Sequence, residues 1–291
     1  MTHEASAERR LIDGYDTFLD VFDLITAGEA FDDLVFFNLT SMPAAGRELK
    51  TDALARTAGG GAVTSGVAAA RAGARVRIVA GLSAAAARAL RLDAVSIVNL
   101  RRPGESAALT VALSTRRDRR FVTFNGMNPQ LPARILALVP RLRARHVHFA
   151  LHPGRCALWL GALDRLHRAG TTTSWAFGWN PDLRRDRDFP RLVDGLDYLF
   201  VNRDEAGAYR CRPSRGMTVI TLGTAGARAI GDGVDLRVPS PRVRAVDTTG
   251  AGDVFAGAFL AARLSGAPLE RALRRATRAA AASTRRPGGL A

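Results

Sequence analysis

Lysine is nearly absent from this chain, although arginine is plentiful. Lys50 is the only lysine in 291 residues, and Leu49 stands before it. A phosphate-binding loop of the GxxxxGK[ST] type needs glycine followed by lysine, so the sequence excludes one. The dinucleotide fingerprint GxGxxG is also missing after the early strands. A phosphate site in this chain must therefore be built in another way.

Cysteine and long apolar runs are scarce too. Cys156 and Cys211 lie far apart without CxxC spacing, which argues against a zinc site and a disulfide framework. No run of about 18 uncharged apolar residues occurs, and the charged N-terminus lacks the apolar core of a signal peptide. We therefore expect no membrane partner and a cytoplasmic location. Residues 1–19 are expected to be a polar extension, and residues 20–291 one folded domain.

The net charge of +15 points to acidic partners. A basic face is how many proteins bind nucleic acid. The arginines are scattered from Arg9 to Arg286, however, and their small clusters lack interleaved aromatic residues and any recognisable nucleic-acid module. We expect no specific nucleic-acid partner, and a basic surface would equally attract anionic nucleotides and sugar phosphates.

Strand-like and helix-like segments alternate along most of the chain. Apolar strand-like runs are followed by polar or glycine-rich turns and then by helical segments. This order predicts an α/β fold with a mostly parallel sheet and helices on both faces. The strand-like segments are residues 21–27, 75–81, 146–150, 172–177, 198–201 and 217–223, the helical ones are 62–73, 84–92, 158–169, 183–196 and 269–282, and short antiparallel strands are expected at 229–230 and 236–238.

Two regions depart from this parallel pattern. Residues 108–114 and 120–125 are strand-like and joined by a short charged link, which predicts an antiparallel hairpin. Residues 34–58 alternate short apolar pieces with turn residues, as an excursion or lid would. We therefore predict a small inserted β lid made of segments about 34–58 and 103–126.

The most informative stretch is residues 247–253, Asp-Thr-Thr-Gly-Ala-Gly-Asp, which leads into an apolar helix. The first N–H groups of a helix lack partners and its dipole places partial positive charge there, so a phosphate can dock without lysine. Gly250 and Gly252 remove the Cβ atoms that would hold a phosphate away from the backbone. Asp253, in the first helical turn, could accept a proton from a hydroxyl that attacks this phosphate.

Further polar residues follow the ends of predicted strands, where ligands gather in open α/β sheets. Asp32 or Asp33 is a candidate for binding substrate hydroxyls, and turn formation is the alternative. Asn202 and Glu205 open a helix, and either a functional role or a helix cap explains them.

The glycine and histidine clusters each require a choice between two interpretations. Gly59, Gly60 and Gly61 precede a helix of small residues, so they permit close approach to a ligand or form only a flexible loop. His146 and His148 share one face of a strand by alternation. No carboxylate or cysteine completes a metal set with them, so we expect structural roles for these histidines.

Four motifs along the chain resemble those of the PfkB carbohydrate kinases, which have the ribokinase-like fold, and they occur in the same order. The motifs are the glycine motif at residues 59–73, NxxE at 202–205, TLGxxG at 221–226 and, most specific, residues 247–253 with Phe255 and Gly257. The resemblance covers about residues 21–290. It implies a three-layer α/β/α sandwich with a mostly parallel central sheet and a small inserted β lid.

The resemblance also implies a reaction, the ATP-dependent transfer of the γ-phosphoryl group to a hydroxymethyl group of a small carbohydrate. Asp253 would be the base, and the backbone amides of Gly250, Ala251 and Gly252 would form the hole that stabilises charge on the phosphoryl oxygens. A nucleoside kinase of the same fold is one alternative. A non-catalytic basic binding protein that keeps the fold is the alternative from another class.

Ligands and partners follow from the same resemblance. The residues expected at the ATP site are Thr221, Gly223, Gly226, Thr249, Asn202 and Glu205, the last two holding Mg²⁺ through water. The residues expected at the acceptor site are Asp33, Gly59, Gly60, Gly61, Thr64 and Asp253. Asp247 and Thr249 lie where many members bind a monovalent cation, so K⁺ is a further candidate. The lid is expected to pair two subunits in a homodimer.

The chain departs from the family pattern at several positions. Thr64 stands where the glycine motif usually has asparagine, residues 83–94 are shortened, and Thr277 stands where asparagine is common. Residues 177–180 lack the aspartate that many members carry before the asparagine. None of these departures affects Asp253 or its hole, but they leave the choice between sugar and nucleoside open.

Overall fold

The computed structural model describes residues 20–93, 95–115, 119–286, 288 and 290. The expected N-terminal extension of residues 1–19 and the middle of the charged hairpin link lie outside the described residues.

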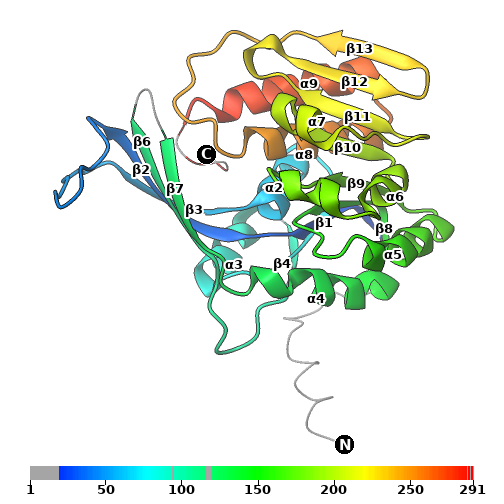
Figure 1. Cartoon of the computed structure of the whole chain (residues 1–291), viewed down its shortest axis with the longest axis horizontal. Coiled ribbons are helices and arrows are strands. Elements are labelled where there is room, and N and C mark those ends of the chain that lie inside the picture. The colour runs from blue at the N-terminus through cyan, green and yellow to red at the C-terminus, as the bar shows by residue number, and fades with distance from the viewer. Residues whose placement is uncertain (1–19, 94, 116–118, 287, 289, 291) are drawn as a thin grey trace, which may run out of the picture.

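Within this part of the chain, nine strands form one sheet in the order β13-β12-β11-β10-β9-β8-β1-β4-β5 (Figure 1). The pairs from β5 to β11 are parallel, and β12 and β13 add an antiparallel edge. The bounds are β1 Phe22–Gly28, β4 Val76–Ala80, β5 Ser96–Asn99, β8 Ala144–Ala150, β9 Thr172–Ala176, β10 Tyr198–Asn202, β11 Met217–Thr221, β12 Ala227–Gly231 and β13 Val234–Val238. The mostly parallel sheet is therefore confirmed.

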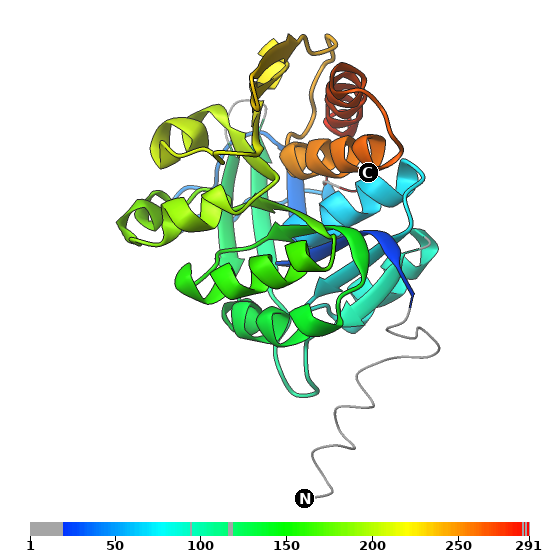
Figure 2. The same cartoon turned by 90° about the vertical axis from the view of Figure 1, so that its right-hand side faces the viewer.

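Helices cover both faces of this sheet and make the predicted three layers. One apolar core lies under α2, α3, α8 and α9, and a second lies under α4 to α7. Figure 2 shows the cyan, orange and red helices α2, α8 and α9 on one side and the green helices on the other. The bounds are α2 Gly61–Arg71, α3 Ala84–Leu90, α4 Leu131–Leu138, α5 Ala157–Arg168, α6 Phe189–Asp194, α7 Arg203–Tyr209, α8 Ala251–Leu264 and α9 Leu269–Ser283. None of the described helices has both the length and the apolarity needed to cross a bilayer.

Helices α2 and α8 pack closely because glycine lies at their crossing. A Cβ atom built on Gly257 of α8 would lie 2.1 Å from the carbonyl oxygen of Ser65 in α2. On the other side of α2, a Cβ on Gly66 would lie 2.7 Å from Oγ1 of Thr26 in β1. These contacts fix the N-termini of both helices relative to the end of β1, where the candidate site lies.

A second, four-stranded sheet with the order β3-β2-β6-β7 forms the lid. Its strands are β2 Phe31–Leu39, β3 Leu54–Gly59, β6 Leu109–Thr115 and β7 Arg119–Phe124. Figure 1 shows it projecting from one side of the main body. The predicted hairpin is confirmed, because β6 and β7 pair antiparallel. The turn considered as the alternative for Asp32 and Asp33 is wrong, since Phe31 begins β2 and both residues lie on this lid strand.

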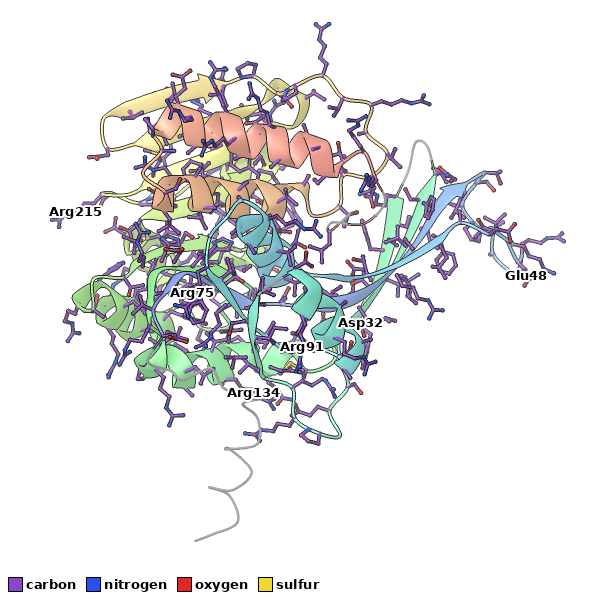
Figure 3. The ribbon with its side chains drawn as sticks, turned by 180° about the vertical axis from the view of Figure 1, so that it is seen from behind. Asp32, Glu48, Arg75, Arg91, Arg134 and Arg215 are labelled. Atoms are coloured by element: carbon purple, nitrogen blue, oxygen red, sulfur yellow. The ribbon has the colours of Figure 1, made fainter. Side chains whose placement is uncertain are left out.

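Arginine side chains are distributed over separate elements of the surface. Figure 3 labels Arg75 before β4, Arg134 on α4 and Arg215 before β11, in different parts of the molecule. Several are paired: Arg75 lies 3.1 Å from a carboxylate oxygen of Asp20, and Arg134 forms an ion pair with Glu105. The positive charge is thus spread rather than concentrated on one helix or strand.

Candidate active site

A cavity of about 290 Å³ lies where the carboxyl ends of the parallel strands meet the N-termini of α2 and α8. Three carboxylates line it, those of Glu29, Glu205 and Asp253, together with Gly61 and Gly252. The sequence-predicted base and the expected magnesium ligand therefore share one cavity. Glu29 was missed, although it directly follows Gly28 at the carboxyl end of β1, the kind of position at which ligands gather.

The anion turn, residues 247–253, ends in the first turn of α8. Gly250 caps the helix with a φ of +71°, a left-handed conformation that glycine adopts without strain. A Cβ atom on Gly252 would meet no atom within 4 Å, so the space in front of this residue is open. The N–H group of Ala251 donates a long bond of 3.3 Å to the carbonyl of Thr248. The helix therefore presents its N-terminal end, with its partial positive charge, to the cavity.

Asp253 carries the most informative electrostatics of the site. Burial raises its pKa, and the nearby charges of Glu205 and Glu29 raise it further, to about 7. Its Oδ1 would lie 3.2 Å from a Cβ atom on Gly61, so the glycine provides the room for this carboxyl group. A carboxyl group that ionises near neutral pH, at a helix N-terminus, is well matched to accept a proton from a hydroxyl.

The glycines at residues 59–61, where β3 ends and α2 begins, are close to other protein atoms. A Cβ atom on Gly59 would lie 1.9 Å from Oδ2 of Asp33, and one on Gly60, whose φ is +92°, would lie 2.4 Å from the carbonyl oxygen of Glu29. Gly61 begins the helix. These glycines pack against other protein atoms at the end of β3 and the start of α2 rather than forming a flexible loop, and their close approach to a ligand stays a prediction.

Asn202 and Glu205 form a capping box at the start of α7. The Asn202 side chain accepts a bond from the Glu205 N–H (2.9 Å), and the Glu205 carboxylate accepts one from the Asn202 N–H (2.8 Å). Both residues also line the cavity that contains Asp253. Burial raises the pKa of Glu205, and the Asn202 N–H opposes this shift. The cap thus fixes oxygen donors at the cavity wall, a donor set that suits Mg²⁺.

A second cavity, of about 370 Å³, adjoins the first and shares Thr221 and Gly252 with it. The expected nucleotide residues Gly223 and Gly226 line this second cavity, as does Thr277. The hydroxyl of Thr277 donates to the carbonyl of Leu273 in its own helix (2.7 Å). The paired cavities give room for an elongated ligand that passes the N-terminus of α8.

Asp32 and Asp33 have different surroundings in the lid. Asp32 accepts a bond from the hydroxyl of Ser83 (2.8 Å), which ties the lid to the start of α3. Asp33 is half-buried, and this desolvation together with the charges of Asp32 and Asp247 raises its pKa to about 7. The structure therefore brings Asp33 near the anion turn. Thr64 lines a separate cavity behind α2.

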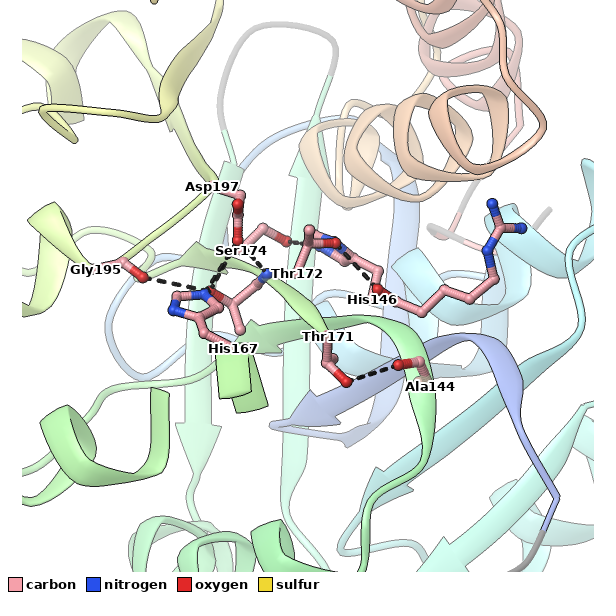
Figure 4. Close-up of polar contacts among 10 residues, drawn as sticks. Ala144, His146, His167, Thr171, Thr172, Ser174, Gly195 and Asp197 are labelled. Carbon is pink, nitrogen blue, oxygen red and sulfur yellow. Dashed lines mark hydrogen bonds and ion pairs between the residues drawn. The ribbon is translucent and has the colours of Figure 1, made fainter. Parts of the chain in front are cut away.

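The buried histidines form a hydrogen-bond network, and Figure 4 shows the part of it around His146. The ring nitrogens of His146 lie 2.7 Å from the hydroxyls of Thr172 and Ser174, and Nδ1 of His148 lies 2.8 Å from Ser174. Burial lowers the pKa of both histidines to about 3. The network bonds both ring nitrogens of His146 and Nδ1 of His148, as a structural role predicts, whereas Nε2 of His148 is buried without a hydrogen-bond partner among the described residues.

Comparisons with known proteins agree with this geometry. The model of the pfkB family of carbohydrate kinases matches residues 22–291. A ribokinase from Bacillus subtilis (strain 168) is 38% identical over 101 residues, a match that covers 31% of this chain and 34% of the ribokinase. An adenosine kinase from Sinorhizobium meliloti has a TM-score of 0.75 at 20% identity, over 94% of this chain and 96% of that one. An E. coli protein described as a ribokinase II, solved with ATP and Mg²⁺, has a TM-score of 0.74 at 20% identity, over 92% and 94%. At these identities the two structures show that the fold is shared.

Proposed function

Because this chain belongs to the pfkB family of carbohydrate kinases, we propose that it is an ATP-dependent sugar kinase. It transfers the γ-phosphoryl group of ATP to a hydroxymethyl group of a small carbohydrate. One observation carries the proposal: Asp253, whose pKa is raised to about 7, lies at the N-terminus of α8 in a cavity that shares two lining residues with a second one. The base and the anion site therefore lie beside two cavities, which together can hold two substrates.

In the proposed reaction, the Asp253 carboxylate takes the proton of the acceptor hydroxyl as its oxygen bonds to the γ-phosphorus. The bond from that phosphorus to the β-phosphate oxygen breaks, and ADP leaves with the electron pair. The amides of Gly250, Ala251 and Gly252, at the positive end of α8, stabilise the charge on the transferred group. Phosphoryl transfer depends mainly on such positioning and electrostatic stabilisation.

We assign the second cavity to the nucleotide. Thr221, Gly223 and Gly226 line it or its junction with the first cavity. Thr249 would contact the phosphates from the anion turn. Glu205 and Asn202 would hold Mg²⁺ through water, and when bound the ion supplies positive charge to the phosphate oxygens.

The acceptor is proposed to lie between the lid and the N-terminus of α2. Asp33 would bind the hydroxyls of the acceptor. The glycines at 59–61, which lack side chains, would allow the acceptor to approach the backbone closely. The N–H of Thr64 donates to the carbonyl of Gly60 (2.9 Å), so Thr64 is proposed to act by fixing the first turn of α2.

A panel of acceptors, assayed by ADP release, tests the sugar proposal. The panel contains ketoses, aldoses, deoxy-keto acids and nucleosides. The likeness to an adenosine kinase makes a nucleoside kinase the second candidate. Activity confined to nucleosides would favour it over the sugar kinase. No ADP release with any acceptor, combined with salt-sensitive binding to nucleic acid, would support the non-catalytic alternative.

We also propose a homodimer that forms through the lid. Phe121, Val122 and Phe124 of β7 are 52%, 71% and 57% exposed, and they lie on the edge strand of the lid sheet. An apolar edge of this kind is a common pairing surface. Light scattering that shows a monomer at working concentrations would refute the dimer. A cytoplasmic location stays a prediction.

A further inference from the structure

One arginine of the lid reaches the anion turn of the main body. Arg119, the first residue of β7, places Nη2 2.8 Å from Oδ1 of Asp247. Its Nη1 lies 2.8 Å from the hydroxyl oxygen of Thr249 and 3.4 Å from that of Thr248. The side chains of Arg119 and Asp247 are 22% and 4% exposed, so the ion pair is largely shielded from solvent.

The carboxylate of Asp247 also joins the anion turn to the C-terminal segment. Its Oδ1 accepts the N–H of Thr249, and its Oδ2 accepts the N–H of Gly288, each at 2.8 Å. Burial opposes the ionised form, but these N–H groups and the Arg119 guanidinium offset it, so the pKa of Asp247 is lowered. One charged group thus connects the lid, the anion turn and the C-terminal segment.

These contacts do not fit a monovalent cation at Asp247 and Thr249. The carboxylate and the hydroxyl that such an ion would use already accept bonds from Arg119 and from backbone N–H groups. A second positive charge beside the guanidinium would be repelled, and burial strengthens that repulsion. While Arg119 contacts Asp247 and Thr249, its guanidinium supplies the positive charge that a monovalent cation would supply there.

We infer that Arg119 is a positioning residue that replaces a monovalent cation at the anion turn. Because Arg119 belongs to the lid and Asp247 to the main body, the bridge forms only when the lid lies over the turn. The guanidinium then holds Asp247 and Thr249, and through them the amides of Gly250 and Gly252, in the orientation that receives the phosphoryl group. The inference rests on the proposed kinase function.

The test compares the wild type with Arg119→Ala, Arg119→Lys and the control Arg120→Ala. Arg120 is exposed and adjacent on the same strand, where successive side chains point to opposite faces. Turnover is measured by ADP release in tetramethylammonium chloride, in KCl and in guanidinium chloride at millimolar concentration. We expect the wild type and Arg120→Ala to turn over equally in all three salts. Arg119→Ala should lose about 10- to 100-fold in kcat, and guanidinium or K⁺ should restore part of it.

Hydrogen exchange of the amides of residues 247–252 gives a readout that does not need turnover. Exchange should be faster in Arg119→Ala than in the wild type, and guanidinium should slow it again. The exchange rate of Arg119→Lys should lie between those of the wild type and Arg119→Ala. Activation of the wild type by K⁺, or an Arg119→Ala loss that neither cation relieves, would overturn the inference. If the wild type released no ADP with any acceptor, the kinase proposal would fail, and the exchange data would still decide whether Arg119 holds the turn.

Discussion

Replacing Asp253 by asparagine should stabilise the protein at alkaline pH while it removes most of the activity. The folded state raises the pKa of this carboxyl group from 3.8 to about 7, mainly by burial. Below the lower of these two pKa values, the group is neutral in both the folded and the unfolded state, so it does not change the free energy of unfolding. Above the higher value it is ionised in both, and the folded state carries a disfavoured charge. At 1.36 kcal/mol per unit, the cost at high pH is at most about 4 kcal/mol.

Asparagine has the same shape without the charge, so the Asp253→Asn variant should avoid this cost. Urea unfolding followed by tryptophan fluorescence, at about pH 5 and about pH 8.5, measures the free energy of unfolding at each pH. The advantage of the variant should grow from the lower to the higher pH. Turnover should fall by roughly 10²–10⁴-fold, the usual contribution of a general base.

A matched control is Asp232→Asn, which changes an exposed carboxylate in the turn between β12 and β13. It should not alter turnover. Two results would refute the reasoning on Asp253. One is near-normal turnover of a folded Asp253→Asn protein, and the other is a stability difference from the wild type that does not change with pH.

Four further predictions concern the surroundings of the base and the core. Glu205→Gln removes one of the charges that raise the pKa of the base, so the acid limb of the kcat/KM profile should move to lower pH. Gly252→Ala should leave the fold intact but lower kcat/KM by about 10²–10³-fold, because its methyl group enters the anion site. Gly257→Ala should instead destabilise the fold by about 1–3 kcal/mol, since its methyl group meets the α2 backbone. Burial keeps His146 and His148 neutral down to about pH 3, so the free energy of unfolding should fall as pH drops from about 6.5, with a slope approaching 2.7 kcal/mol per unit.

Each of these has a contrary outcome. If the acid limb of Glu205→Gln does not move, the charge of Glu205 does not influence the pKa of Asp253. Equal thermal stabilities of the two glycine variants would show that the α2–α8 contact is less tight than the structure has it. A free energy of unfolding that stays level between about pH 6 and pH 4 would mean that the two histidines are protonated in the folded state.

The layered fold could be predicted because its parallel strands are buried on both faces and therefore form apolar runs. Other elements gave weak signals. Strand β5 is only four residues long and half-buried at the edge of the sheet, so its apolar run is too short to stand out. Asp32 and Asp33 favour turns by composition, but pairing of β2 with β3 and β6 overrides that preference. Tertiary pairing thus decided what local propensity could not.

The site was predictable where its residues are close in sequence. Gly250, Gly252 and Asp253 lie within one turn and the start of its helix, so their spacing alone indicates a base beside an anion site. Glu29 joins them only through the sheet. Arg119 lies 130 residues from Thr249, and it follows a charged link that resembles any solvated turn. Contacts of such long range leave no pattern in a single sequence.

The central claim is phosphorylation of a primary hydroxyl with Asp253 as the base. Proton-coupled phosphorus NMR of the product, formed from ATP and the best acceptor of the panel, tests it most directly. A phosphate on a hydroxymethyl carbon couples to two protons, so the account predicts a triplet that forms with the wild type and not with Asp253→Asn. A doublet from a secondary carbon, inorganic phosphate alone, or the same triplet at the same rate from the variant would contradict it.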